Sequence, residues 1–457
     1  MWDIEQIITV AIGVIMIVSF ISLVVYSMKG FNLMVGFFGM ATLWLVLVLI
    51  GNQFTGVMGD TTVIDALTYV YQTGPAGYAS SILVNVFFGS FFGRILMDTG
   101  IAATLIRKVV ELGGDRPSLT MILLCIATAL CFTSMTGIGP VISIAVIVLP
   151  ILLALGIPAP IALFAFMGSI MTGMLANVTN FAQYQGIMAG LDERFTAEYD
   201  YSQYFAFGAT GMAIALVVVL VVCCVLLKRH SASHAWAAST PSQSEPVDAP
   251  WFSWISVILP VILVAAFKCP IILAFCVSGV YALLTCGKFK GGFVNICSML
   301  ARLFSDGSVD VAPMVGFLLT LSMFNNAATY AAPYFQSIIG GIFPTNPLPL
   351  AILFAVIMPL GFFRGPTNLV GCGTAVAAVV LNLGVTWAVP FLYPIFATAT
   401  IVPHHIDLTQ SWVVWGLGYT KVGSKDFAKM AMPTGWVIGA ILCMVAYVMY
   451  GAAGVVA

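Results

Sequence analysis

The chain has 457 residues, of which 61% are hydrophobic and 7% are charged, and its formal net charge is −1. Soluble domains carry about 25% charged residues, so the composition excludes an ordinary soluble enzyme and indicates an integral membrane protein. The near-zero net charge gives no basic surface for nucleic acid. The ten cysteines are scattered without a CxxC pair. They predict core packing, and we expect no metal and no cofactor.

The first half of the chain opens with apolar segments long enough to span a bilayer, at about 5–27, 30–51 and 76–97. No basic region precedes the first segment, so we expect a retained helix and not a cleaved signal peptide. After the amphipathic stretch 97–116, residues 118–156 form two short apolar pieces around a Thr/Ser/Gly/Pro tip. This pattern predicts a re-entrant hairpin, because non-helical backbone at membrane depth is tolerated only where protein walls surround it.

A broken helix is predicted next, at about 158–190, because the polar run ANVTNFAQYQG interrupts an apolar segment. An acidic loop and a closing helix that ends at Arg229 complete the first half. Residues 230–250 are polar, small and Pro-containing, and predict a cytoplasmic linker.

The second half repeats this order of elements. The elements predicted there are spans at 251–267, 269–286 and 309–324, an interfacial amphipathic helix at 291–307, a hairpin at about 347–385, a broken helix at about 388–420 and a last span. An internal repeat of this kind is typical of secondary transporters. We predict an all-α polytopic fold with two re-entrant hairpins, two broken helices and about ten spanning helices, divided into repeats at 1–229 and 251–457.

The charges of the loops predict the orientation. With the N-terminus outside, the loop lysines and arginines fall on the cytoplasmic side, apart from Arg194 and Lys268. The segment before the first hairpin is basic, whereas its counterpart before the second hairpin carries no charge. The two hairpins are therefore expected to enter from opposite sides, as inverted repeats of a multi-pass protein of the bacterial inner membrane.

Arg364 lies at the tip of the second hairpin, within FFRGPTNLVGCGT, and is the one cation predicted near mid-membrane. A charge there is costly enough to indicate a functional site. Its planar guanidinium suits the carboxylate of a substrate. The alternative is a structural arginine that satisfies free carbonyls of the tip.

His404, His405 and Asp407 lie in the break of the second broken helix. Histidine changes charge in the physiological range and a neighbouring carboxylate tunes it, so this cluster predicts proton coupling. The alternative is that the three side chains hydrogen-bond unwound backbone or lie nearer the membrane surface.

Neutral polar side chains at the first break and at both hairpin tips are further candidates for substrate binding. They can bond hydroxyl or carboxylate groups, or coordinate Na⁺, and the alternative is packing. The set is Thr133, Ser134, Thr136, Asn177, Thr179, Asn180, Gln183, Thr367 and Asn368. Arg94 and Asp98, spaced i, i+4, are expected to form a structural ion pair.

Four stretches, 97–114, 136–158, 364–380 and 404–418, resemble the ion transporter superfamily of anion permeases. That group includes gluconate, citrate and lactate permeases and dicarboxylate symporters, and the gluconate branch is nearest. The resemblance implies an inverted-repeat fold with scaffold and transport parts, an elevator-type movement and, often, a homodimer.

These features predict a proton-coupled symporter of a small organic anion, a carboxylate or sugar acid such as citrate or gluconate. A cation/proton antiporter on the same repeats is the alternative transporter, and Na⁺ is the alternative coupling ion. Neither HExxH, GxSxG nor a pair of catalytic aspartates occurs in any predicted span, so we do not expect an enzyme. A membrane assembly subunit would not need two buried polar tips.

Overall fold

The computed structural model describes residues 3–29, 31–114, 116–229 and 248–456, which are mostly helical. The first half contains α1 (Ile4–Met28), α2 (Leu33–Thr55), α3 (Val63–Thr68), η1 (Tyr69–Thr73), α4 (Gly74–Tyr78), η2 (Ala79–Leu83), α5 (Val84–Asp98), α6 (Ile101–Gly113), α7 (Pro117–Cys131), α8 (Ile138–Ala154), α9 (Ala159–Met174), α10 (Val178–Ala189), α11 (Arg194–Ala197) and α12 (Tyr201–Arg229). The second half contains η3 (Trp251–Trp254), α13 (Ile255–Phe267), α14 (Ile271–Thr285), α15 (Phe293–Ile339), η4 (Gly340–Ile342), α16 (Pro347–Ile357), η5 (Met358–Arg364), α17 (Gly373–Leu381), β1 (Thr386–Trp387), α18 (Val389–His405), α19 (Ser411–Thr420), α20 (Ser424–Tyr450), η6 (Gly451–Ala453) and β2 (Val455–Val456).

The helices have the length and composition of a polytopic membrane protein, as the composition predicts. Among the described residues, five helices are long and apolar enough to cross a membrane, or up to eight if each bent pair is one span. The apolar helices α7, α8, α13 and α14 are shorter and fall outside this count, which is therefore lower than the ten spans expected. The predicted linker, 230–250, lies outside the described residues except for its last three positions.

Two helices depart from the simple pattern. The interfacial helix and the span predicted at 291–307 and 309–324 both belong to α15, a helix of 47 residues that bends by 51° between Ala312 and Met314. Pro313 has no N–H to donate at this point, and that accounts for the bend. The helix from α3 to α5 contains two five-residue π turns, η1 and η2.

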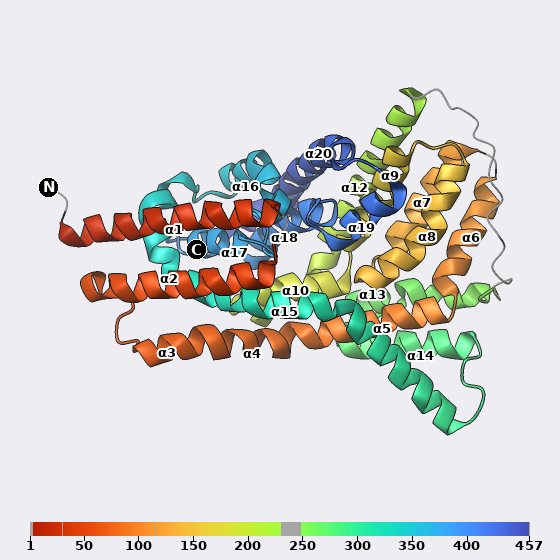
Figure 1. The fold of residues 1–457 in the computed structure, drawn as a ribbon, viewed down its shortest axis with the longest axis horizontal. Coiled ribbons are helices and arrows are strands. Elements are labelled where there is room, and N and C mark those ends of the chain that lie inside the picture. The colour runs from red at the N-terminus through yellow and green to blue at the C-terminus, as the bar shows by residue number, and fades with distance from the viewer. Residues whose placement is uncertain (1–2, 30, 115, 230–247, 457) are drawn as a thin grey trace.

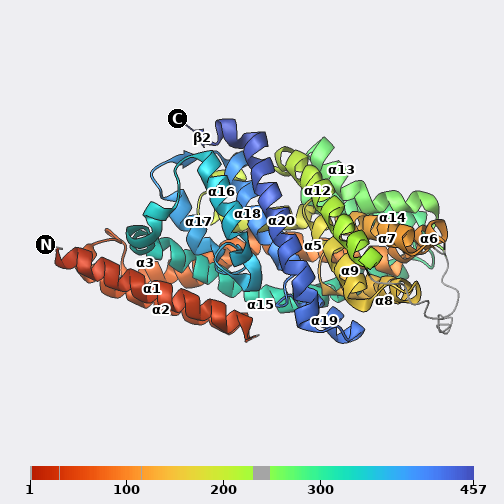
Figure 2. The same ribbon diagram turned by 90° about the horizontal axis from the view of Figure 1, so that it is seen from above.

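Many of the helices fall into two packed groups (Figures 1 and 2). We call α1, α2, α3–α5, α14 and α15 the α15 layer, because α15 packs along α1, α2 and α5, and α14 packs on α5. We call α7, α9, α12, α16, α18 and α20 the α9/α18 core. Every residue of α18 from Phe391 to His405 is buried, as is every residue of α9 from Ile161 to Met174. A helix that is apolar on all sides belongs inside a bundle.

The two hairpins lie toward opposite ends of the molecule (Figure 1), with α7 and α8 at one end and α16–η5 and α17 at the other. The chain bends by 62° between α9 and α10, and α10 then reaches α17 and α18. After the second break, α19 packs on α8 and α9. Each half of the chain therefore sends one half-helix into the other half, and the two breaks meet.

Candidate functional site

The tip of the second hairpin is held in a tight backbone loop. The Cys372 N–H donates to the Arg364 carbonyl at 3.0 Å and the Gly373 N–H donates to the Asn368 carbonyl at 2.8 Å. A Cβ at Gly371 would overlap the Arg364 carbonyl, so the loop requires glycine there. Phe363 and Arg364 both adopt a positive φ, 56° and 59°. Such a conformation costs a non-glycine residue about 1–2 kcal/mol, and strain of this kind gathers at functional sites.

The Arg364 side chain is buried, with 8% of its surface exposed. Its Nη1 donates to the Val370 carbonyl at 3.2 Å, and its guanidinium carbon lies 5.2 Å from the centre of the Phe317 ring. Its Nε has no acceptor within the described part of the chain. None of the ion pairs among the described residues includes Arg364. A guanidinium carries five N–H donors, so Arg364 is a buried cation with most of its donors unused.

Arg364 lines a cavity of about 440 Å³ between the α15 layer and the α9/α18 core. Its walls come from the α1–α2 turn, the tip of the first hairpin, the bend of α15, the second hairpin and the break between α18 and α19. The lining residues are Phe31, Asn32, Leu33, Met34, Gly137, Ile138, Asp310, Val311, Met314, Phe317, Arg364, Val370, His404, Thr409, Gln410, Ser411 and Trp412. The volume suits a small ligand.

The first hairpin tip is neutral and is anchored by an amide. Gly137 has a φ of 97°, which allows the chain to turn into α8. The Asn177 Nδ2 donates to the carbonyls of Phe132 at 2.8 Å and Met135 at 3.0 Å. Its Oδ1 accepts from the Asn180 N–H at 2.9 Å and caps α10.

The second break is anchored by a carboxylate. Asp407 accepts hydrogen bonds from the N–H groups of Thr409, at 2.9 Å, and Phe363. The neighbouring His405 joins the two breaks, because its Nε2 lies 3.3 Å from the Asn180 Nδ2 and its Nδ1 lies 2.8 Å from the Ile401 carbonyl. The His404 Nε2 lies 2.8 Å from the Gln410 Nε2.

Of the predicted site residues, Arg364 and His404 line the cavity. The others are all buried and do not line it. Those that hydrogen-bond backbone groups are Thr133, Asn177, Asn368, His405 and Asp407. The hydroxyls of Ser134, Thr179 and Thr367 have no partner among the described residues, and Thr136, Asn180 and Gln183 are also buried.

The predicted Arg94–Asp98 ion pair is wrong. Arg94 instead makes a two-pronged ion pair with Asp310 of α15, from Nε to Oδ2 and from Nη2 to Oδ1, both at 2.5 Å. Asp98 pairs with Lys288, at 3.3 Å, and Arg302, at 2.9 Å. The sequence spacing favoured a partner four residues away. Because α15 packs along α5, it brings Asp310 within bonding distance of Arg94 and Arg302 within bonding distance of Asp98.

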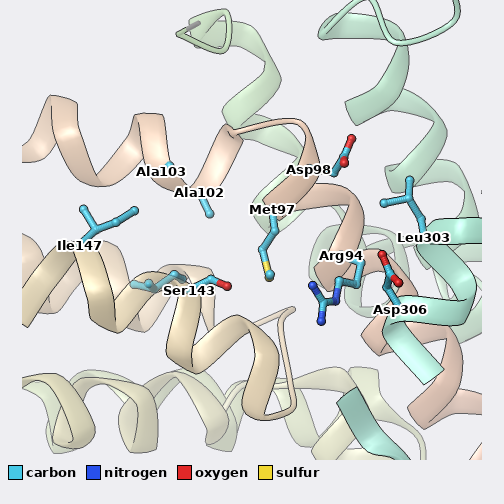
Figure 3. A pocket seen from close by; sticks show the side chains of 10 residues that line it. Arg94, Met97, Asp98, Ala102, Ala103, Ser143, Ile147, Leu303 and Asp306 are labelled. Carbon is cyan, nitrogen blue, oxygen red and sulfur yellow. The ribbon is translucent and has the colours of Figure 1, made fainter. Parts of the chain in front are cut away.

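A second cavity, of about 360 Å³, lies beside this ion pair, between α5, α6, α8 and the first part of α15. Figure 3 shows Arg94, Met97, Asp98, Ser143, Leu303 and Asp306 around it. Sequence reasoning missed Asp310, and it missed Gln410 and Ser411 of the Arg364 cavity. The polar run PHHIDLTQSW contains Gln410 and Ser411, and its polarity next to an apolar segment could have indicated both residues.

The fold resembles that of a known transporter. The YdaH transporter of Alcanivorax borkumensis, whose crystal structure is described as having an unusual topology, superimposes with a TM-score of 0.62 over 92% of this chain and 99% of that chain, at 13% sequence identity. No protein-family model and no curated protein matches the chain. The chain is thus an integral, multi-pass membrane protein with the fold of a transporter.

Proposed function

We propose that the protein is a secondary active transporter that carries a small organic anion together with protons. The observation that carries this proposal is Arg364, a buried cation with spare donors in the wall of a cavity large enough for a small molecule. Arg364 forms no direct ion pair among the described residues, and a carboxylate of the substrate would accept two parallel hydrogen bonds from its guanidinium. In a site shielded from water such bonds are stronger than in solution.

Proton coupling is assigned to His404, His405 and Asp407. His404 supports the assignment because it lines the same cavity as Arg364, so a proton on its ring and an anion on Arg364 would attract each other. Asp407 accepts a hydrogen bond from the backbone of the second hairpin, and His405 lies within hydrogen-bond distance of a backbone carbonyl of α18. Uptake into proteoliposomes should respond to an imposed pH gradient in sodium-free buffer. A strict sodium requirement with no effect of the pH gradient would assign the coupling to Na⁺.

Movement of the α9/α18 core against the α15 layer is the expected transport step, in the manner of an elevator. Close packing between the α15 layer and α10, the half-helix that follows α9, supports a sliding boundary: a Cβ at Gly89 of α5 would overlap the Thr179 hydroxyl of α10. Gly89→Leu should therefore reduce uptake more than it reduces binding.

The membrane orientation is proposed from the loop charges, with the N-terminus outside and residues 228–250 in the cytoplasm. Single cysteines placed in that segment and in 325–345, in a Cys-less background, would be labelled with an impermeant reagent. Labelling of the 228–250 segment from outside intact cells would overturn the inverted orientation. The predicted homodimer would be measured by light scattering on protein purified in detergent.

Binding to purified protein tests the anion assignment. A panel of carboxylates and sugar acids should raise the unfolding temperature through mass action. The rise should disappear in Arg364→Gln and persist in part in Arg364→Lys, because an ammonium cannot reproduce the planar fork. If anions stabilise Arg364→Gln as much as the wild type, Arg364 is structural and the proposal fails.

A further inference from the structure

The Arg94–Asp310 ion pair lies between two cavities. Asp310 lines the Arg364 cavity, whereas Arg94 lines the second cavity, beside Asp98 and Asp306 (Figure 3). The side chain of Asp310 is 7% exposed and that of Arg94 is 28% exposed. The pair is thus oriented, with its carboxylate toward the Arg364 cavity and its guanidinium on the other side.

The Arg364 cavity is therefore bipolar. Among its lining residues in the described chain, Arg364 supplies a positive charge, Asp310 supplies a negative charge, and His404 is the one titratable group besides them. The remaining polar side chains, Asn32, Thr409, Gln410 and Ser411, are neutral. A ligand that complements these walls presents an anion at one end and hydrogen-bond donors elsewhere.

Asp310 is fixed in place by its neighbours. The bidentate contact with Arg94 compensates its charge, and a carboxylate so paired keeps free lone pairs that can accept further hydrogen bonds. The tip of the first hairpin packs on it, since a Cβ at Gly139 would overlap both carboxylate oxygens. The charged or titratable groups around Asp310 are Arg94 from α5, Asp306 one turn earlier on α15, and Arg364 and His404 across the cavity.

We propose that Asp310 determines which anions this transporter accepts: monocarboxylates that carry hydroxyl or ammonium donors bind, and a second carboxylate is rejected. This inference rests on the proposed function, because it takes Arg364 as the site of the first carboxylate. Donors of the ligand bond Asp310, whereas a second anion near it is repelled. The ion pair with Arg94 weakens this repulsion without removing it, because the carboxylate and not the guanidinium lines the Arg364 cavity.

The test is a matched set of six-carbon ligands, measured by isothermal titration on the purified full chain. Hexanoate has no second polar group, adipate has a second carboxylate, 6-aminohexanoate has an ammonium and gluconate has hydroxyls. We expect gluconate or 6-aminohexanoate to bind at least about tenfold more tightly than both hexanoate and adipate, and the stronger of the two assigns the donor as hydroxyl or ammonium.

Two variants separate the charge of Asp310 from that of its partner. Asp310→Asn removes the repulsion but leaves Arg94 unpaired, and Arg94 could itself attract a second carboxylate. The double variant Arg94→Gln/Asp310→Asn removes both charges, and there adipate should come within about threefold of the preferred ligand. Far-ultraviolet circular dichroism and size-exclusion chromatography would verify that each variant is folded.

The outcomes distinguish this inference from the proposed function. If adipate binds the wild type as tightly as both donor ligands, or if the double variant keeps the wild-type ratio, Asp310 does not select the ligand. If no carboxylate in the set binds, or if binding survives Arg364→Gln unchanged, the proposed function fails as well.

Discussion

The tips of the two hairpins differ in the group that anchors each of them. Asn177 donates from its amide to two carbonyls of the first tip, whereas Asp407 accepts from the Phe363 N–H of the second tip. The first tip carries no charge, and the second carries Arg364 in a left-handed conformation. A donor anchor leaves the first tip neutral, while a carboxylate anchor adds a negative charge near the buried arginine. Under the proposed function, charge recognition is therefore expected of the second hairpin and a supporting role of the first.

The largest expected effect is the loss of anion affinity when the charge of the second tip is removed. Arg364→Gln should weaken anion binding by roughly 30- to several thousand-fold, since breaking a charge-assisted bond in a dry site costs about 2–5 kcal/mol. Ser134→Ala at the first tip removes a hydroxyl that has no partner among the described residues and should change affinity by less than about threefold. Equilibrium binding at equal folded amounts measures both. Equal losses in the two variants would contradict the division of roles.

Substitutions of the two anchoring side chains, Asn177 and Asp407, should have the next largest effect, on the free energy of unfolding. Asn177→Asp replaces the amide donor by a carboxylate that faces two carbonyl oxygens, and should lower the free energy of unfolding by about 3–5 kcal/mol. Asp407→Asn keeps an oxygen that can accept from Phe363 and should lower it by about 1–2 kcal/mol. Denaturant unfolding in detergent compares the variants.

In transport assays, Asp407→Asn should also abolish the response of uptake to a pH gradient while retaining exchange.

Glycine substitutions compare the backbones of the tips. At Gly371 a Cβ would overlap the Arg364 carbonyl, so Gly371→Ala should cost about 2–3 kcal/mol and displace the arginine. Gly137 has a φ of 97° but space around its Cα, so Gly137→Ala should cost about 1–2 kcal/mol from backbone strain alone. Thermal unfolding and binding are measured together. Gly371→Ala should weaken binding more than Gly137→Ala does, although Gly137 also lines the cavity, and equal losses of affinity would contradict this difference.

The smallest expected effect is on stability and comes from an ion pair in the loop after the first broken helix. This loop contacts the end of the second hairpin. Arg194 pairs with Asp192 at 2.6 Å and donates to the Trp387 carbonyl at 3.2 Å. Burial alone would raise the pKa of Asp192, but the hydrogen bonds and charge of Arg194 hold it below its ordinary value. The stabilisation is therefore present above the unfolded pKa of about 3.9 and is lost as the pH falls through the lower folded pKa. Because the pair is partly exposed, we expect about 1 kcal/mol or less.

Unfolding at pH 7 and at pH 3 would be compared in the wild type and in Asp192→Asn. The wild type should lose slightly more stability on acidification than the variant does. Identical pH dependence in both would show that this ion pair does not contribute.

Local features of the sequence were enough to predict an all-α membrane fold with hairpins and broken helices. Gly and Pro mark the ends of the short helices, and Arg364 stands out because few charges occur in apolar segments. The wall of the cavity was harder to predict. Asp310 reaches it only because α15 packs along α5, and its partner Arg94 lies more than two hundred residues away in the chain. Spacing along one helix cannot reveal such a pairing, and so it favoured Asp98.

The two π turns in the helix from Val63 to Asp98 help to set the direction in which Arg94, near the end of that helix, points. A π turn holds an additional residue relative to an α turn, and each residue rotates an α-helix by about 100°. Deleting one residue within Tyr69–Thr73 could be absorbed by converting that turn to α, with little change in helix length. Arg94 would then keep its place opposite Asp310. The same deletion after Val84, where the helix is regular, would turn Arg94 away by about 100°. Tolerance of single-residue deletions should therefore be confined to the π turns.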